Sequence, residues 1–223
     1  MIVEPVIAEI LPPPVAAVEA FEDPPGATLF PEEEAAMARA VPRRRGEFAA
    51  GRACARAALA QLGLPAAPIL PGPRGAPQWP PGVVGTITHC DGYRASAVAH
   101  ARDVLTLGLD AEPDGPLPGG VLDAVSLAEE RDRLPGLAAA APHVPWDRLL
   151  FCAKEAVYKA WFPLAGRWLG FEEAAITFAP DAGTFTARLL VPGPAVGGRP
   201  LDGFSGRWLA RGGLLLAAIA VPA

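Results

Sequence analysis

Alternating apolar and polar positions are the main feature of this sequence, and they predict a protein rich in short strands. Such alternation places every second side chain on one buried face of a strand. The clearest case is 83–90, followed by an Asp91-Gly92 turn and a second strand at 95–99, a hairpin with His89 near its tip. Strands are predicted at 1–10, 83–90, 95–99, 104–113, 174–178, 184–191, 205–209 and 214–221.

Helical periodicity predicts a long helix over 45–63 that ends at Gly63 before Pro65. Its apolar stripe is bordered by a stripe of arginines, and Arg43 and Arg44 add cations just before it. Two interpretations stay open: a solvated helix whose arginine stems cover apolar surface, or a binding site for an anion. The apolar stripe contains Phe48, Ala55, Leu59 and Leu62, and the cationic stripe contains Arg45, Arg52 and Arg56.

A second long helix is predicted to begin at Pro145. Six apolar residues between Trp146 and Ala160 share one face, whereas Arg148, Glu155 and Lys159 lie together on the opposite side. Glu155 and Lys159 are spaced for an ordinary i,i+4 surface ion pair. Shorter helices are expected to begin at Pro31 and, through a Ser126/Glu129 capping box, within 121–134, with 138–145 as a loop.

Composition narrows the class of protein. The 223 residues carry a net charge of −5, which argues against a dedicated nucleic-acid binder. The longest apolar tract, 214–221, is much shorter than the roughly 20 residues of a membrane span, so we expect a cytoplasmic protein. The three cysteines are odd in number and show no C-x-x-C spacing, which indicates reduced thiols.

The stretch LGLDAEP, 107–113, carries the strongest chemical signal. If the segment is extended, Asp110 and Glu112 leave the same face of a strand, and Pro113 ends the strand directly after them. Two adjacent carboxylates are suitable ligands for Mg²⁺, which keeps other positions for water and phosphate. The alternative is a solvated acidic strand end.

Four motifs in one order identify a family resemblance: Gly51-Arg52, Thr88-His89-Cys90, LGLDAEP and FCAKEAVYK at 151–159. With them the chain resembles a 4′-phosphopantetheinyl transferase of the monomeric Sfp type, nearest the branch of the enterobactin-synthesis enzyme and its actinobacterial relatives. The resemblance implies an α/β (α+β) fold, a pseudo-dimer of two similar halves, each a small mostly antiparallel sheet packed with helices. Residues 1–103 would hold the coenzyme A phosphate and adenosine, and 104–223 the metal site, the catalytic helix and the carrier-docking surface.

The resemblance also assigns roles to individual residues. Glu155 matches the proposed general base, and Lys159 matches the lysine near the transferred phosphate. The magnesium ligands implied are Asp110, Glu112 and Glu155, and the coenzyme-binding groups implied are Arg44, Arg52, Arg74, Thr88, His89 and Lys159. The chain departs from the family at Phe151 and Cys152, where Trp and Ser are frequent, and at Pro71, in a turn where some relatives carry another cation.

The implied reaction transfers 4′-phosphopantetheine from coenzyme A to a serine of an apo acyl or peptidyl carrier protein and releases 3′,5′-ADP, with Mg²⁺ as cofactor. We expect a monomer without nucleic-acid or membrane partners. The alternatives are a catalytically silent carrier-binding scaffold and another Mg²⁺- and nucleotide-dependent phosphotransferase, although the chain has no Walker A motif.

Carrier docking is expected at an apolar cluster that follows the Glu155 helix. The alternative is that these side chains pack the C-terminal half. The cluster lies beside Lys159 and Arg167 and contains Trp161, Phe162, Leu164, Trp168, Leu169 and Phe171.

Overall fold

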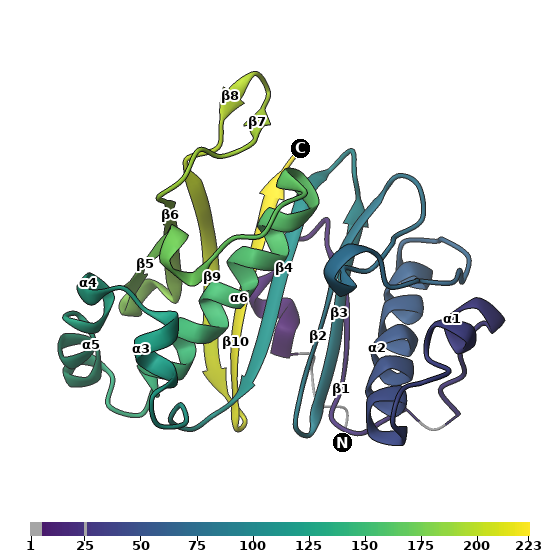
Figure 1. The fold of residues 1–223 in the computed structure, drawn as a ribbon, viewed down its shortest axis with the longest axis horizontal. Helices are drawn as coiled ribbons and strands as arrows, with labels where there is room; N and C mark the ends of the chain where they lie inside the picture. Colours follow the sequence, from purple (N-terminus) through teal and green to yellow (C-terminus); the bar gives the residue numbers. More distant parts are fainter. Residues whose placement is uncertain (1–5, 25) are drawn as a thin grey trace.

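A computed structural model describes residues 6–24 and 26–223. The described chain forms two large antiparallel sheets side by side, each covered by one long helix, and a separate two-stranded sheet, 195–200 (Figure 1). The first half contains η1 (Val6–Ile10), β1 (Ala16–Ala20), α1 (Pro31–Ala36), α2 (Pro42–Gln61), η2 (Pro73–Gly75), β2 (Val83–Cys90) and β3 (Tyr93–His100). The second contains β4 (Val104–Pro113), α3 (Val121–Val125), α4 (Ala128–Arg131), α5 (Leu134–Ala140), α6 (Trp146–Ala165), η3 (Phe171–Glu173), β5 (Ala174–Ala179), η4 (Pro180–Ala182), β6 (Thr184–Leu189), β7 (Ala195–Val196), β8 (Arg199–Pro200), β9 (Gly203–Arg211) and β10 (Leu214–Pro222).

The strand order is β1-β3-β2 in the first sheet and β4-β10-β9-β6-β5 in the second. Helix α2 packs on the first sheet and α6 on the second, so the α+β class with two sheet-and-helix halves is confirmed. In the first half a strand is followed by one short helix, α1, and then by the long α2; in the second, three short helices, α3 to α5, stand between β4 and the long α6. Small side chains on α2 and α6 let both helices lie close to their sheets, because alanine adds little bulk between backbones.

The two sheets meet edge to edge, β2 against β4, in the middle of the molecule (Figure 1). Threonine hydroxyls cross this boundary: the backbone N–H of Leu109 donates to Thr86 Oγ1 (3.3 Å), and that of Ala111 donates to Thr88 Oγ1 (3.1 Å). Thr86 and Thr88 are both buried. Thr86 and Thr88 are two residues apart, so both hydroxyls point toward β4. The halves are therefore joined by hydrogen bonds between side chains of β2 and the backbone of β4.

Gly108 sets the distance between β4 and α6. A Cβ added to Gly108 would overlap the carbonyl oxygen of Ala156, so only glycine lets the helix pack at this depth. Two residues earlier, the hydroxyl of Thr106 donates to the carbonyl of Ala160 at 2.8 Å. Helix α6 is thus seated directly over the strand that carries Asp110.

A buried glutamate anchors the helices of the first half. Glu33 on α1 is fully buried, accepts hydrogen bonds from the backbone N–H groups of Phe30 and Ile69, and pairs with Arg56 on α2. Removing one partner of such a buried pair costs about 3–5 kcal/mol, because the other charge is left unpaired. The contact ties α1, α2 and the segment after α2 together.

The second half repeats this anchor. Glu130 on α4 accepts hydrogen bonds from the backbone N–H groups of Leu127 and Ile176, and its side chain pairs with Lys154 on α6 at 2.8 Å. Lys154, the first lysine of the FCAKEAVYK motif, is buried and also donates to two backbone carbonyls. Both anchors join a helix cap, the backbone N–H of a distant isoleucine and a cation on the long helix, which supports a repeated half.

Several local predictions were wrong. The segment Val6–Ile10 is a 3₁₀ helix and not a strand, and the rest of the predicted strand at 1–10 lies outside the described residues. The cap of α4 is Leu127 with Glu130, one residue beyond the predicted Ser126/Glu129 box, because Ser126 instead donates to the Leu122 carbonyl. Residues 138–140 belong to α5, whose Ala-rich sequence favours a helix.

Candidate active site

The acidic pair projects from the end of β4 toward α6. Asp110 and Glu112 lie two and four residues after Gly108, the residue against which α6 packs, so all three face the helix. Asp110 is buried, with 6% of its surface exposed, and Glu112 is half-buried. The alternative of a solvated strand end is wrong for Asp110.

Asp110 is held from both halves of the molecule. Lys159 Nζ donates to Asp110 Oδ1 at 2.7 Å, and Thr88 Oγ1 donates to the same oxygen at 3.2 Å. The second oxygen, Oδ2, is buried and has no hydrogen-bond partner among the residues that the structure describes. Lys159 therefore pairs with Asp110 and with the Leu109 carbonyl, and the predicted surface pair of Lys159 with Glu155 does not form.

Glu112 is paired with Arg148, a contact that the sequence analysis missed. Arg148 Nη1 lies 3.4 Å from Glu112 Oε2. Burial, reinforced by the nearby charge of Asp110, raises the pKa of Glu112 to about 7. Burial and the same aspartate also raise the pKa of Glu155. The charge of Asp110 therefore makes the ionised forms of Glu112 and Glu155 less favourable.

A cation is the group that these carboxylates fit. As the side chains stand within 6–24 and 26–223, no group of three or more His, Cys, Asp or Glu residues is placed so that it could hold a metal ion. Lys159 and Arg148 each hold one carboxylate of the strand pair. A bound divalent ion would give the unpartnered Oδ2 of Asp110 a partner and would favour the ionised forms of Glu112 and Glu155, whose pKa values are raised.

A cavity of about 310 Å³ opens beside this cluster, between the two halves. Glu155, Tyr158, Lys159 and Phe162 line it from α6, and the turn at 73–79 closes the other side. Glu155 and Lys159 thus face one cavity that both halves form.

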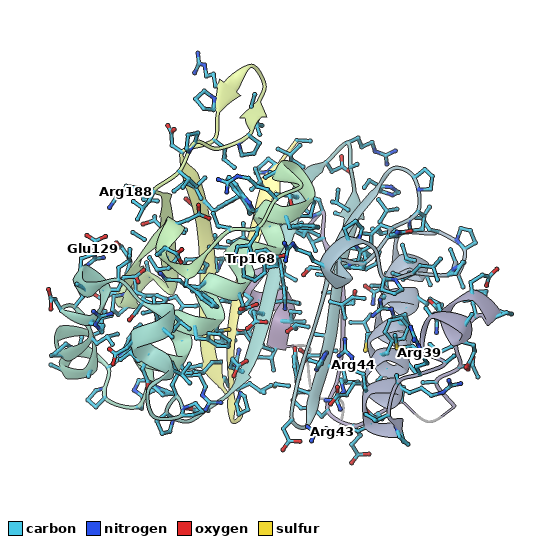
Figure 2. The ribbon with its side chains drawn as sticks, viewed as in Figure 1. Arg39, Arg43, Arg44, Glu129, Trp168 and Arg188 are labelled. Atoms are coloured by element: carbon cyan, nitrogen blue, oxygen red, sulfur yellow. The ribbon has the colours of Figure 1, made fainter. Side chains whose placement is uncertain are left out.

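Across this cavity, Arg74 contacts the second half. Its guanidinium lies over the ring of Trp168, 5.3 Å from the centroid, and Figure 2 shows Trp168 near the boundary of the halves. Arg74 is also the one non-glycine residue with positive φ (54°) in the described part of the chain. A strained residue of this kind is common where a turn carries function.

Cations gather at the other end of β2. Arg44 Nη1 lies 3.1 Å from His89 Nε2, and His89 and Arg43 line a cavity of about 300 Å³. Figure 2 labels Arg43 and Arg44 in the first half. Burial lowers the pKa of His89, and the charge of Arg44 adds to this effect. His89 is therefore neutral near pH 7 and accepts the hydrogen bond from Arg44.

The remaining arginines of α2 have partners inside the protein. Arg45 pairs with Glu34 and Arg56 with Glu33. Arg52 is buried, stacks on Phe48 at 3.5 Å and donates to the Ile69 carbonyl; burial lowers its pKa to about 10. Arg52 and Arg56 are therefore not solvated side chains, whereas the side chain of Arg45 is 43% exposed in its pair with Glu34. The acidic run at 32–34, predicted only as a helix start, was the overlooked signal.

Comparison with known proteins covers most of the chain. Residues 32–99 match a family model described as the 4′-phosphopantetheinyl transferase N-terminal domain, and residues 106–195 match the 4′-phosphopantetheinyl transferase superfamily. The chain is 62% identical to 4′-phosphopantetheinyl transferase Svp of Streptomyces mobaraensis, over 97% of this chain and 89% of that protein. It is 52% identical to 4′-phosphopantetheinyl transferase PptT of Mycobacterium tuberculosis, over 98% and 99%, and 33% identical to enterobactin synthase component D of Salmonella typhi, over 60% and 55%.

Proposed function

Because the chain belongs to the 4′-phosphopantetheinyl transferase family, we propose that it moves 4′-phosphopantetheine from coenzyme A to a carrier-protein serine with the residues gathered around Asp110. The observation that carries this assignment is that Glu155 and Lys159 line the cavity between the halves and that Lys159 also pairs with the buried Asp110. The family uses coenzyme A and carrier proteins. The predictions of a monomer and of a cytoplasmic location complete the proposal.

Asp110, Glu112 and Glu155 are the residues that would hold Mg²⁺. The ion would neutralise charge on the pyrophosphate of coenzyme A. The unpartnered Asp110 Oδ2 and the raised pKa values of Glu112 and Glu155 support this choice, because each carboxylate gains from a nearby positive charge. Oxygen ligands of this type favour magnesium over softer metals.

Glu155 and Lys159 would perform the transfer. The serine Oγ forms a bond to the phosphorus that carries pantetheine, and the bond from that phosphorus to the oxygen of 3′,5′-ADP breaks. Glu155, half-buried and facing the cavity, takes the serine proton, and its raised pKa suits a general base. Lys159 uses two donors on Asp110 and Leu109, which fixes its ammonium group beside the phosphate.

The 3′-phosphate of coenzyme A would bind at Arg44 and His89. Arg44→Ala should weaken binding of coenzyme A about tenfold, since one charge-assisted hydrogen bond contributes about 1.5–3 kcal/mol. Binding of 3′-dephospho-coenzyme A should change little, and calorimetry measures both. Arg39→Ala is the control, because Arg39 is an exposed arginine that does not line this cavity. Equal losses for both ligands would contradict the assignment.

The coenzyme-binding role of Arg52 needs a different test from that of Arg44, because Arg52 also has contacts inside the protein. Arg52→Ala removes a hydrogen bond to Ile69 and a stack on Phe48, so it should lower stability as well as coenzyme affinity. The preference for coenzyme A over its 3′-dephospho form separates these effects, because a purely structural loss weakens both ligands equally.

Some residues of the predicted docking cluster are buried in the structure, and others are partly exposed. Trp161 and Leu169 are buried in the core of the second half, which is a correction to the cluster as a whole. Trp168 is 49% exposed beside the cavity, and Phe162 lines the cavity wall. We therefore place carrier docking at Trp168, Phe162 and the adjoining Arg167.

Trp168→Ala should raise the KM for the carrier several-fold, because interface aromatic side chains often contribute more than 1 kcal/mol. Leu190→Ala is the control, since Leu190 is similarly exposed on the same half. Steady-state kinetics with varied carrier measure the effect, with coenzyme A held saturating. If Trp168→Ala lowered the melting temperature and left the carrier KM unchanged, Trp168 would contribute to stability and not to carrier docking.

Mass spectrometry of an apo carrier tests the activity itself. Incubation with the protein, coenzyme A and Mg²⁺ should add one phosphopantetheine group to the carrier serine. Chelation with EDTA should stop the reaction, and added Mg²⁺ should restore it. A carrier that binds but keeps its mass would favour the scaffold alternative.

A further inference from the structure

The polar face of α6 carries two cations, Lys159 and Arg148, and each pairs with one of the two carboxylates of β4. Lys159 takes one oxygen of Asp110, and Arg148 takes one oxygen of Glu112, at 2.7 and 3.4 Å. In both carboxylates the other oxygen has no protein hydrogen bond within the described chain. The same arrangement thus occurs twice, eleven residues apart on one helix face.

Arg148 is fixed from a second direction. Its Nη2 donates to the carbonyl of Pro116 at 2.6 Å, in the turn that follows β4. The neighbouring Asp147 accepts a hydrogen bond from the Leu117 backbone N–H, at 3.0 Å, so the same turn is attached twice to the start of α6. The guanidinium therefore has a defined position before it meets Glu112.

We propose that Arg148 is a positioning residue that holds Glu112 Oε2 and thereby presents the other carboxylate oxygen to the divalent ion. Glu112 lies near the end of its strand, and its side chain is 22% exposed. Without Arg148 the carboxylate has several rotamers available, and only some of them face Asp110 and Glu155. Outer contacts of this kind orient metal ligands and typically change metal affinity by about 10–100-fold.

This inference rests on the proposed magnesium site, and metal binding tests it without any turnover. Titration of the intact protein with Mn²⁺, followed by electron paramagnetic resonance, should show Arg148→Leu binding about tenfold more weakly than wild type. Arg148→Lys should recover part of the affinity, because an ammonium group reaches Glu112 but cannot also hold Pro116 as the planar guanidinium does. Coenzyme A affinity in EDTA should stay within twofold of wild type.

Arg133→Leu is the matched control. Arg133 also pairs with a glutamate and donates to a backbone carbonyl, that of Ile176, but it lies far from Asp110 in the fold. It should lower stability comparably and leave Mn²⁺ affinity unchanged. In a Glu112→Gln background, Arg148→Leu should cause no additional loss of Mn²⁺ affinity, which shows that its effect passes through Glu112.

Two results would overturn the role of Arg148. Unchanged Mn²⁺ affinity in Arg148→Leu would show that Glu112 needs no support, and tighter binding would show that Arg148 competes with the ion. Failure of the wild-type protein to bind Mn²⁺ would reject the magnesium site itself, and the role of Arg148 with it. That outcome is distinct from a loss confined to the variant.

Discussion

Asp110→Ala should reduce transfer to a carrier by about 10³-fold or more, because it removes both a metal ligand and the group that positions Lys159. The reaction depends on neutralising a pyrophosphate and placing the serine, and Asp110 lies where both halves of the molecule contribute to that task. The mass of the carrier after timed incubation with saturating Mg²⁺ and coenzyme A measures the loss.

The same variant should keep its fold. Asp110 makes two side-chain hydrogen bonds, with Lys159 and Thr88, and its Oδ2 has no partner in the described chain. Lys159 is partly exposed and keeps its hydrogen bond to the Leu109 carbonyl when the carboxylate is removed. The melting temperature in EDTA should therefore fall only modestly, and added Mg²⁺ should no longer increase it. Asp114→Ala, at the exposed end of the same segment, is the control and should be fully active. Near wild-type loading by Asp110→Ala would reject the metal assignment.

Gly108→Ala should destabilise the protein by about 3 kcal/mol, because the new methyl group would meet the backbone of α6. The methyl carbon would overlap the Ala156 carbonyl oxygen, and a helix backbone cannot turn away as a side chain can. Since α6 must shift as a unit, Glu155 and Lys159 would move relative to Asp110. Urea denaturation and carrier loading should therefore both show a loss.

Gly136→Ala provides the comparison. It lies in helix α5 with open space where a Cβ would be added, so alanine should stabilise the protein by up to about 1 kcal/mol through helix propensity. Activity should not change. If Gly108→Ala were as stable as Gly136→Ala, the seating of α6 on β4 would not depend on glycine.

Periodicity was sufficient to locate the elements that carry the site. The hairpin of β2 and β3, strand β4 and helices α2 and α6 were all predicted close to their observed bounds. The strong signals came from residues whose local preference and tertiary role agree, such as the β-branched run of β2 and the alanine-rich faces of both helices. The family resemblance and the transferase activity were confirmed as well.

The ion pairs of the site could not be predicted from the spacing of residues along a single helix or strand. Spacing on α6 favoured a Glu155–Lys159 pair, whereas Lys159 reaches across to Asp110 on another element. Arg148 was assigned only to a polar face, because its partners in β4 and the turn after it are some thirty residues away. Ion pairs between different elements depend on distances in the folded protein, and residue spacing along one helix does not give these distances. The roles of the individual site residues stay predictions.

The contact between β2 and β4 makes the two halves dependent on each other. Each of these strands is the edge of its own sheet, and the hydroxyls of Thr86 and Thr88 satisfy backbone N–H groups of the facing edge. A half expressed alone would present that edge to solvent, with hydrogen-bonding groups ready to pair with the edge of another copy. Separated halves should therefore aggregate, and this gives the joined chain a selective advantage that is independent of catalysis.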